Sequence, residues 1–136
     1  MHTPDYLDLL IVEVAKAADL CFKPWVFSVL KEPDGINPKL NEEPLNELLL
    51  RLECRTSDGE RVPPNDLEVE IYRSGGEMNI TIAWLQYPER PMLWQGKYSL
   101  WMDGSSGRKC VMPTNGESIE AFARKLRSIF TSLISP

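Results

Sequence analysis

The sequence predicts an α+β fold, in which an antiparallel sheet of about five or six strands is flanked by an N-terminal and a C-terminal helix in two layers. Apolar residues recur at helical spacing near both ends of the chain, over residues 3–20 and 114–133. Between these segments apolar and polar residues alternate, which is typical of antiparallel strands with one solvated face. Because 136 residues is an ordinary size for one domain, we expect a single domain over residues 1–136.

The first helix is expected to begin at the Thr-Pro-Asp cap of residues 3–5 and to end before Pro24. Its apolar stripe runs from residue 7 to residue 18. Leu9 and Val12 fall beside this stripe and widen the apolar sector. We therefore expect the helix to be buried on more than one side, either within the fold or against a partner.

Six segments have the alternation, or the β-branched and aromatic content, of strands. They are residues 25–30, 48–55, 67–72, 78–84, 96–102 and 109–112. Two connections lack any periodicity. Residues 33–44 form a long loop, which inside a compact domain is often functional or mobile, and the proline-bounded segment 88–96 is expected to form another loop.

The C-terminal helix is expected to start at a capping box formed by Thr114 and Glu117. Its apolar stripe continues from Ile119 to Leu133. Three basic residues are expected on the opposite, solvated side, toward the negative end of the helix dipole. They are Arg124, Lys125 and Arg127.

The composition bears on where the protein resides. No apolar run approaches the ~20 residues that cross a bilayer, so we expect no membrane partner. Residues 1–20 carry four acidic groups, unlike a signal or transit peptide, which predicts a cytoplasmic protein. The cysteines Cys21, Cys54 and Cys110 are odd in number and widely spaced, so buried free thiols fit them better than disulfides or a zinc site.

The net charge of −5 is unevenly distributed, because residues 1–70 carry −8 and residues 71–136 carry +3. Ordinary solvated surface explains this asymmetry, and so does a polarised molecule that steers a partner. The basic clusters, at residues 108–109 and 124–127, are short. Since nucleic acid favours a net basic domain, we expect no nucleic-acid partner.

The residues that catalysis usually needs are scarce. The single histidine, His2, stands at the chain terminus, so the usual base for a serine or cysteine nucleophile is missing. His and Cys clusters and glycine-rich phosphate motifs are absent, so we expect no metal and no cofactor. Glu68 and Glu70 share a strand face at a spacing that suits an acid–base pair, but solvated residues opposite Arg51, Arg55 or Arg73 explain them better. We therefore expect no catalytic residue and no enzyme.

Aromatic side chains outside the predicted core point to a surface that binds another protein or a peptide. The strand at 96–102 is expected to turn positions 98, 100 and 102 toward the core, which leaves Trp101 on the outer face of the sheet. The same alternation places Tyr72 and Leu85 on that face. Exposed aromatic residues gathered on one face are typical of a protein-binding patch.

The predicted loop at 88–96 is a second candidate surface. It carries Met92, Leu93 and Trp94, and large apolar groups in a loop need an explanation. Packing across the end of the core is one explanation, and the lip of a peptide-binding groove is the other. The predicted partner-binding residues are Trp101, Tyr72, Trp94, Met92, Leu93 and Leu85.

Several alternatives stay open. In the first, one of the helices covers the outer face and buries Trp101 completely. In the second, the aromatic face is the interface of a homodimer, so that self-association takes the place of a foreign partner. In the third, an extended peptide adds to an open sheet edge. In the fourth, the concave sheet binds a small molecule or a substrate, with a polar lining of Arg51, Glu68, Glu70 and Tyr72.

The segment W-Q-G-K-Y-S-L-W-M-D, residues 94–103, is similar to stretches of cyanobacterial proteins. The size, acidity and element order resemble those of type III secretion chaperones and of the carboxysome shell-protein assembly chaperone. This resemblance implies a dedicated assembly chaperone or adaptor that escorts one partner protein. It transfers no functional residue to this chain. Sequence and resemblance together predict a cytoplasmic, non-catalytic protein-binding module.

Overall fold

The computed structural model describes residues 6–31, 47–74 and 76–134, so the predicted cap at residues 3–5 and the predicted loop at 33–44 lie outside the described residues. The elements are α1 (Tyr6–Cys21), β1 (Val26–Lys31), β2 (Glu47–Arg55), the 3-10 helix η2 (Pro63–Asn65), β3 (Leu67–Ser74), β4 (Glu77–Trp84), β5 (Met92–Gln95), β6 (Ser99–Met102) and α2 (Gly116–Ile134).

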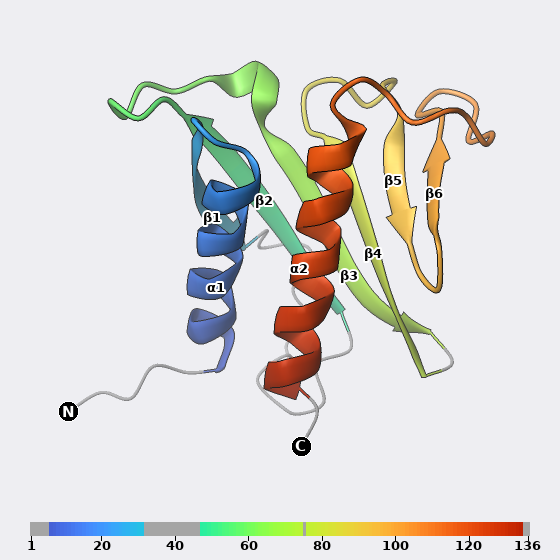
Figure 1. Cartoon of the computed structure of the whole chain (residues 1–136), viewed down its shortest axis with the longest axis horizontal. Helices are drawn as coiled ribbons and strands as arrows, with labels where there is room; N and C mark the ends of the chain where they lie inside the picture. The colour runs from blue at the N-terminus through green and yellow to red at the C-terminus, as the bar shows by residue number, and fades with distance from the viewer. Residues whose placement is uncertain (1–5, 32–46, 75, 135–136) are drawn as a thin grey trace.

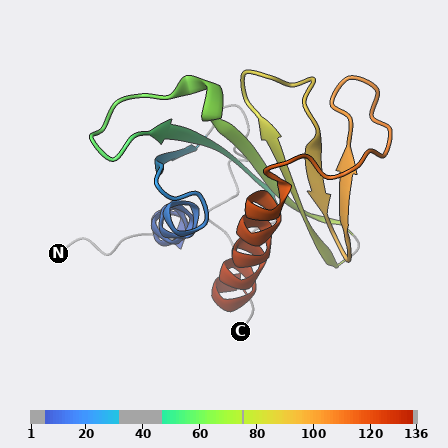
Figure 2. The same ribbon diagram turned by 45° about the horizontal axis from the view of Figure 1, so that its top comes forward.

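The six strands form one antiparallel sheet in the order β1-β2-β3-β4-β5-β6, so each strand pairs with its neighbour in sequence. Both helices lie on the same face of this sheet (Figures 1 and 2). α1 packs on β1, α2 packs across β4 and β5, and the two helices contact each other. The prediction of a two-layer α+β fold with an antiparallel sheet and terminal helices is confirmed.

One strand of the sheet was missed in the sequence, and one predicted strand is not formed. Residues 92–95, expected to be part of a loop, form β5. Pro91 lies directly before this strand, where its missing N–H removes no ladder bond, so the proline does not prevent the strand. Residues 109–112, expected to be a strand, contribute a single isolated bridge from Lys109 to Met102.

One continuous apolar cluster joins the sheet to both helices. Successive inward residues of β2, β3 and β4 face α1 and α2, as the alternation predicted. The largest fully buried side chains include Leu10, Val14, Leu48, Leu50, Leu52, Ile80, Ile82, Leu93, Phe122, Leu126 and Phe130.

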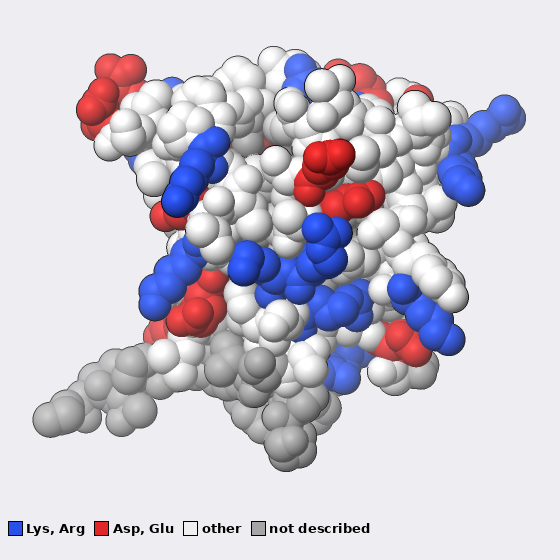
Figure 3. Space-filling view, in the orientation of Figure 1, with Lys and Arg blue, Asp and Glu red and all other residues white. Residues whose placement is uncertain are grey.

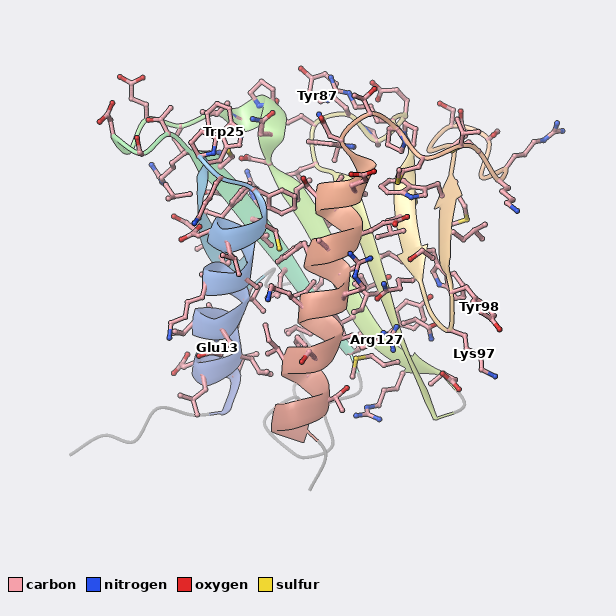
Figure 4. All side chains as sticks on the ribbon, in the orientation of Figure 1. Glu13, Trp25, Tyr87, Lys97, Tyr98 and Arg127 are labelled. Atoms are coloured by element: carbon pink, nitrogen blue, oxygen red, sulfur yellow. The ribbon has the colours of Figure 1, made fainter. Side chains whose placement is uncertain are left out.

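Arg127 corrects the expectation that all three basic residues of the last helix are solvated. Its side chain points from α2 toward β4 and β5 (Figure 4). The guanidinium donates to the carbonyls of Met78 at 2.9 Å, Gln95 at 3.1 Å and Gly96 at 3.0 Å, and to the Gln95 side-chain oxygen at 3.3 Å. A long arginine stem lies along apolar surface while its head reaches polar groups, which helical periodicity does not reveal. Arg124 and Lys125 are exposed as expected, and basic groups gather over α2 in Figure 3.

Each outer edge of the sheet has a backbone group that is already bonded. On β1, the N–H of Phe27 donates to the carboxylate of Asp19 at the end of α1, at 2.8 Å. On β6, the carbonyl of Trp101 accepts a hydrogen bond from the N–H of Cys110 at 2.9 Å. The segment that follows β6 is therefore held along that edge.

Candidate functional site

Trp101 lies on the inner face of the sheet, in contrast to its predicted place on the outer face. Its side chain is 5% exposed, and its strand position pairs with Leu93, which is completely buried. The indole N–H donates to the carboxylate of Glu120 on α2 at 2.8 Å. A Cβ at Gly116 would lie 3.0 Å from the indole ring, so the first turn of α2 packs directly on Trp101.

The faces of β6 are the reverse of the predicted ones because the inner face is polar where β5 ends and β6 begins. Ser99 and Gln95 pair there, and Gln95 is buried beside Arg127. The prediction had placed the residues at 98, 100 and 102 on the inner face. Instead Tyr98 is exposed in the hairpin, as Figure 4 shows, and Leu100 and Met102 face outward.

The outer face of the sheet, which we call the open face, carries no described helix (Figures 1 and 2). The strand register aligns one cross-strand row on it. This row runs through Leu49, Glu70, Thr81, Trp94 and Leu100. All five of these side chains are half-buried, as expected for the surface of a sheet that solvent reaches.

Five apolar or aromatic side chains of β3, β5 and β6 gather at one end of the open face, and we call them the aromatic patch. They are Tyr72, Met92, Trp94, Leu100 and Met102. The register pairs the two methionines with each other, and it pairs Trp94 with Leu100. Tyr72 joins them across β4, because the indole N–H of Trp94 donates to its hydroxyl at 3.1 Å. The patch is therefore one connected surface.

Gly96 allows Trp94 to lie flat on the sheet. A Cβ at Gly96 would stand 2.7 Å from the indole ring and 2.8 Å from the Asn79 side-chain oxygen. Asn79 is 6% exposed beneath this cluster, so the N-x-T sequence that begins with it is not an accessible glycosylation site. Trp94 is fixed by contacts on two sides, which makes it a pre-organised aromatic anchor.

The structure brings together three of the predicted site residues, namely Tyr72, Met92 and Trp94. Leu85 is half-buried directly after β4, and its N–H bonds to the carbonyl of Asp66, which keeps it in line with the outward residues of the strand. Leu93 is a core residue of β5, in contrast to its predicted place in a loop lip, because the segment forms a strand whose alternate side chains point inward.

Leu100 and Met102 belong to the aromatic patch and were missed in the sequence. The prediction had placed both of them on the inner face. The signal that would have identified them is the hairpin itself. Once residues 92–95 are taken as a strand, the short connection through Gly96 pairs Trp94 with Leu100, and the two face the same side.

Acidic groups border the aromatic patch on β2 and β3. Glu68 pairs across the sheet with Arg51, as predicted, and Arg51 contacts Glu53 at 3.3 Å. Glu70 pairs instead with Leu49 and Thr81. Burial raises the pKa of the Glu70 carboxyl above its ordinary value, and the neighbouring charges of Glu47 and Glu68 raise it further. Burial first, and the two acidic neighbours second, therefore destabilise the charge of Glu70.

A pocket of about 220 Å³ lies at the opposite side of the sheet, between the end of α1, the start of β1, η2 and the start of α2. Its apolar walls include Phe22, Trp25 and Trp84, and Asn65, Asn115 and Ser118 supply polar groups. Figure 4 shows Trp25 at this end of the molecule.

The pocket is built on an ion pair between buried Asp66 and half-buried Arg61. Asp66 is completely buried and accepts hydrogen bonds from Arg61 at 2.7 and 2.9 Å and from the Cys54 N–H at 2.8 Å. Burial alone raises the pKa of the Asp66 carboxyl, but these hydrogen bonds outweigh it, so the pKa lies below its ordinary value. This pair fixes η2, which carries Asn65 into the pocket wall.

Among the described residues, neither the aromatic patch nor the pocket contains an evident nucleophile or metal site. Cys21 lines the pocket and Cys54 is buried, both as free thiols, and burial raises the pKa of each. A protonated thiol is a weak nucleophile. Cys21 and Cys110 are half-buried, so the expectation of a buried thiol is met by Cys54 and not by the other two. Within residues 6–31, 47–74 and 76–134, no group of three or more His, Cys, Asp and Glu side chains is placed to hold a metal ion.

Fold and surface together define this protein as a two-layer α+β protein with an aromatic patch on the open face of its sheet. The chain belongs to the family described as Domain of unknown function (DUF8659), whose model matches residues 11–129. No curated protein and no solved structure matches the chain. In the part of the chain that the structure describes, neither helix has the length and apolar character needed to span a membrane.

Proposed function

We propose that this protein is a cytoplasmic, non-catalytic binding module that holds a segment of another protein on its aromatic patch, as an assembly chaperone or adaptor does. The observation that carries the proposal is the asymmetry of the sheet. Both helices pack on one face, and the other face presents a connected surface of aromatic and methionine side chains. Large rigid aromatic groups and adaptable methionines are the side chains that protein-binding surfaces favour.

The chemistry of the open face describes the partner. An apolar segment of the partner would cover Trp94, Leu100 and Met102. A lysine or arginine beside it would meet Glu70, whose charge is destabilised by burial and by its acidic neighbours. Face docking fits the structure better than strand addition, since a backbone group on each outer edge already has a partner.

The test compares proteins recovered from the native cell lysate by the wild-type protein and by charged variants of the patch. Leu100→Glu and Met102→Glu place a carboxylate on the patch near the sheet edge, where the fold tolerates it best. Val111→Glu is the matched control, because Val111 is 85% exposed and lies outside the patch. Thermal unfolding of each variant establishes that it is folded.

We expect one stoichiometric protein with the wild type and with Val111→Glu, and at least a tenfold smaller yield with the patch variants. Equal recovery by all four proteins would place the partner elsewhere and overturn the proposal. Recovery of no protein by the folded wild type would also count against it and direct the search to small ligands.

The pocket of about 220 Å³ favours a second function, the binding of a small molecule. Two tryptophans and two phenylalanines suit a planar apolar group, while Asn65 and Asn115 provide donors and acceptors that fix its orientation. The pocket is distinct from the polar lining of Arg51, Glu68, Glu70 and Tyr72 that the sequence had suggested.

A screen of small aromatic compounds by tryptophan fluorescence tests this second function. A ligand of the pocket should raise the melting temperature of the wild type. Trp25→Ala should weaken the binding of that ligand at least tenfold. Leu100→Glu should leave such binding unchanged, which separates the pocket from the aromatic patch.

A further inference from the structure

The side of α1 that faces away from the core carries three exposed apolar residues. Leu9 is 48% exposed, Val12 is 51% exposed and Leu20 is 53% exposed. Together with Glu13 and Lys16 they recur at spacings of three and four residues, so they form one narrow stripe along the helix. The sequence had anticipated a second buried side of this helix, and none of the described helices and strands covers that side.

This stripe is complementary to itself. A two-fold axis that passes beside α1, perpendicular to the helix at the level between Val14 and Ala15, relates position 9 to 20, position 12 to 17 and position 13 to 16 of the second copy. Two antiparallel copies of the helix would then set Leu9 against Leu20. They would also set Glu13 against Lys16, and both contacts would occur twice.

We propose that this stripe is a homodimer interface, on which α1 of a second copy packs in the antiparallel direction. The apolar ends of the stripe gain from burial, and the central charges fix the register because Glu13 meets Lys16 of the other copy. Within one chain these two side chains are only a loose surface pair, 3.5 Å apart, and both remain substantially exposed. Figure 4 shows Glu13 on α1.

A groove beside the stripe gives the second copy further contact. It has a volume of about 260 Å³ and runs between α1 and α2, where Lys125, Ser128 and Ile129 form the far wall. One pair of helices buries less than the ~800 Å² per partner of a standard interface, so the dimer is expected to be weak. The aromatic patch lies on the other face of the sheet, so dimerisation leaves it accessible.

Charge reversal tests the register directly. Sedimentation equilibrium of the full chain from 5 μM to 500 μM should give a monomer–dimer equilibrium. Glu13→Lys should weaken it about tenfold or more, because it opposes lysine to lysine twice, and Lys16→Glu should do the same with glutamates. An equimolar mixture of the two variants should associate about as tightly as the wild type, since each charge again meets its opposite.

The mixture separates the proposal from effects within one helix. Both variants lack the pair between Glu13 and Lys16 of one chain, so restored association arises only from contacts between chains. Failure of the mixture to associate, or a monomeric wild type at 500 μM, would overturn the proposal. Leu100→Glu serves as the control and should dimerise like the wild type. If it abolishes dimerisation, the aromatic patch is the self-association surface and the α1 proposal is wrong.

Discussion

Trp94 and Trp101 lie on neighbouring strands of one hairpin and face opposite sides of the sheet. Trp101 points toward α2, is 5% exposed and donates to Glu120. Trp94 points to the open face, is half-buried and donates to Tyr72. Both indoles are fixed by a hydrogen bond and by a glycine that leaves room for the ring, Gly116 for one and Gly96 for the other.

The two tryptophans differ in how far the rest of the protein covers them. Trp101 is covered by α2, to which its indole is also bonded, so the fold alone accounts for it. Trp94 is held in place by the same devices and yet keeps part of its ring in contact with solvent. A tryptophan that is ordered but uncovered is poised for an external contact, because little conformational entropy remains to be lost on binding.

The largest expected effect is a loss of stability on removal of the buried residue of the two, Trp101. Trp101→Ala should lower the free energy of unfolding by about 3–5 kcal/mol, since it opens a large cavity under α2 and leaves Glu120 without its donor. Trp94→Ala should cost clearly less, because its ring is already partly hydrated. Urea denaturation of both variants measures the two values. A cost for Trp101→Ala equal to or below that of Trp94→Ala would contradict the assignment of faces.

Arg127→Met removes the hydrogen bonds that tie α2 to the carbonyls of β4 and β5 while it keeps the aliphatic stem. We expect a loss of about 2–3 kcal/mol, because three backbone carbonyls lose a charged donor. Arg124→Met on the exposed side of the same helix is the control and should change the stability by less than about 0.5 kcal/mol. Similar results for the two variants would mean that the Arg127 contacts are not formed in solution.

Gly96→Ala sharpens the open side of the comparison. The added methyl group overlaps the place of the Trp94 indole and should displace the ring, at a cost of about 1–2 kcal/mol. The tryptophan emission should shift, and binding by the aromatic patch should fall although no patch residue has changed. Ser99→Ala, across the same hairpin, should alter neither property. A wild-type emission spectrum for Gly96→Ala would show that the indole does not lie over this residue.

Glu70→Gln gives the smallest effect. The folded state raises the pKa of this carboxyl, so its charge destabilises the fold at pH 7, and this penalty disappears as the pH falls through the raised pKa. Glu70→Gln should therefore stabilise the protein at pH 7, by less than about 1 kcal/mol. Near pH 4 the two proteins should have similar stability. A constant difference across this range, measured by thermal unfolding, would count against the assignment.

The fold was accessible from the sequence wherever one face of an element is apolar and the other is polar. β2, β3 and β4 alternate in this way, and their register agrees with the predicted faces. Strand β5 was obscured by the prolines before it and by its length of four residues. The faces of β6 could not be assigned because both of its parities contain apolar residues, and only its pairing with β5 decides between them.

The candidate site was predicted in part for the same reason. Tyr72 lies on a strand with clear alternation and was placed correctly. Trp101 depended on the parity of β6 and was placed on the wrong face. Arg127 contacts three carbonyls that are far away in sequence, those of Met78, Gln95 and Gly96. These contacts depend on tertiary packing, which helical spacing does not reveal.

The bonded outer edges of the sheet bear on how the protein behaves at high concentration. A sheet with an apolar inner face and unprotected rims can template the growth of cross-β aggregates from its own copies. On the outer edge of β1, the Phe27 N–H is bonded to Asp19. On the outer edge of β6, the Trp101 carbonyl is bonded to the N–H of Cys110, at the end of a turn that Asp103 holds. Each of these contacts removes a backbone group that a second copy could otherwise pair with at that edge. The aromatic patch can then remain exposed with a reduced risk of fibre formation.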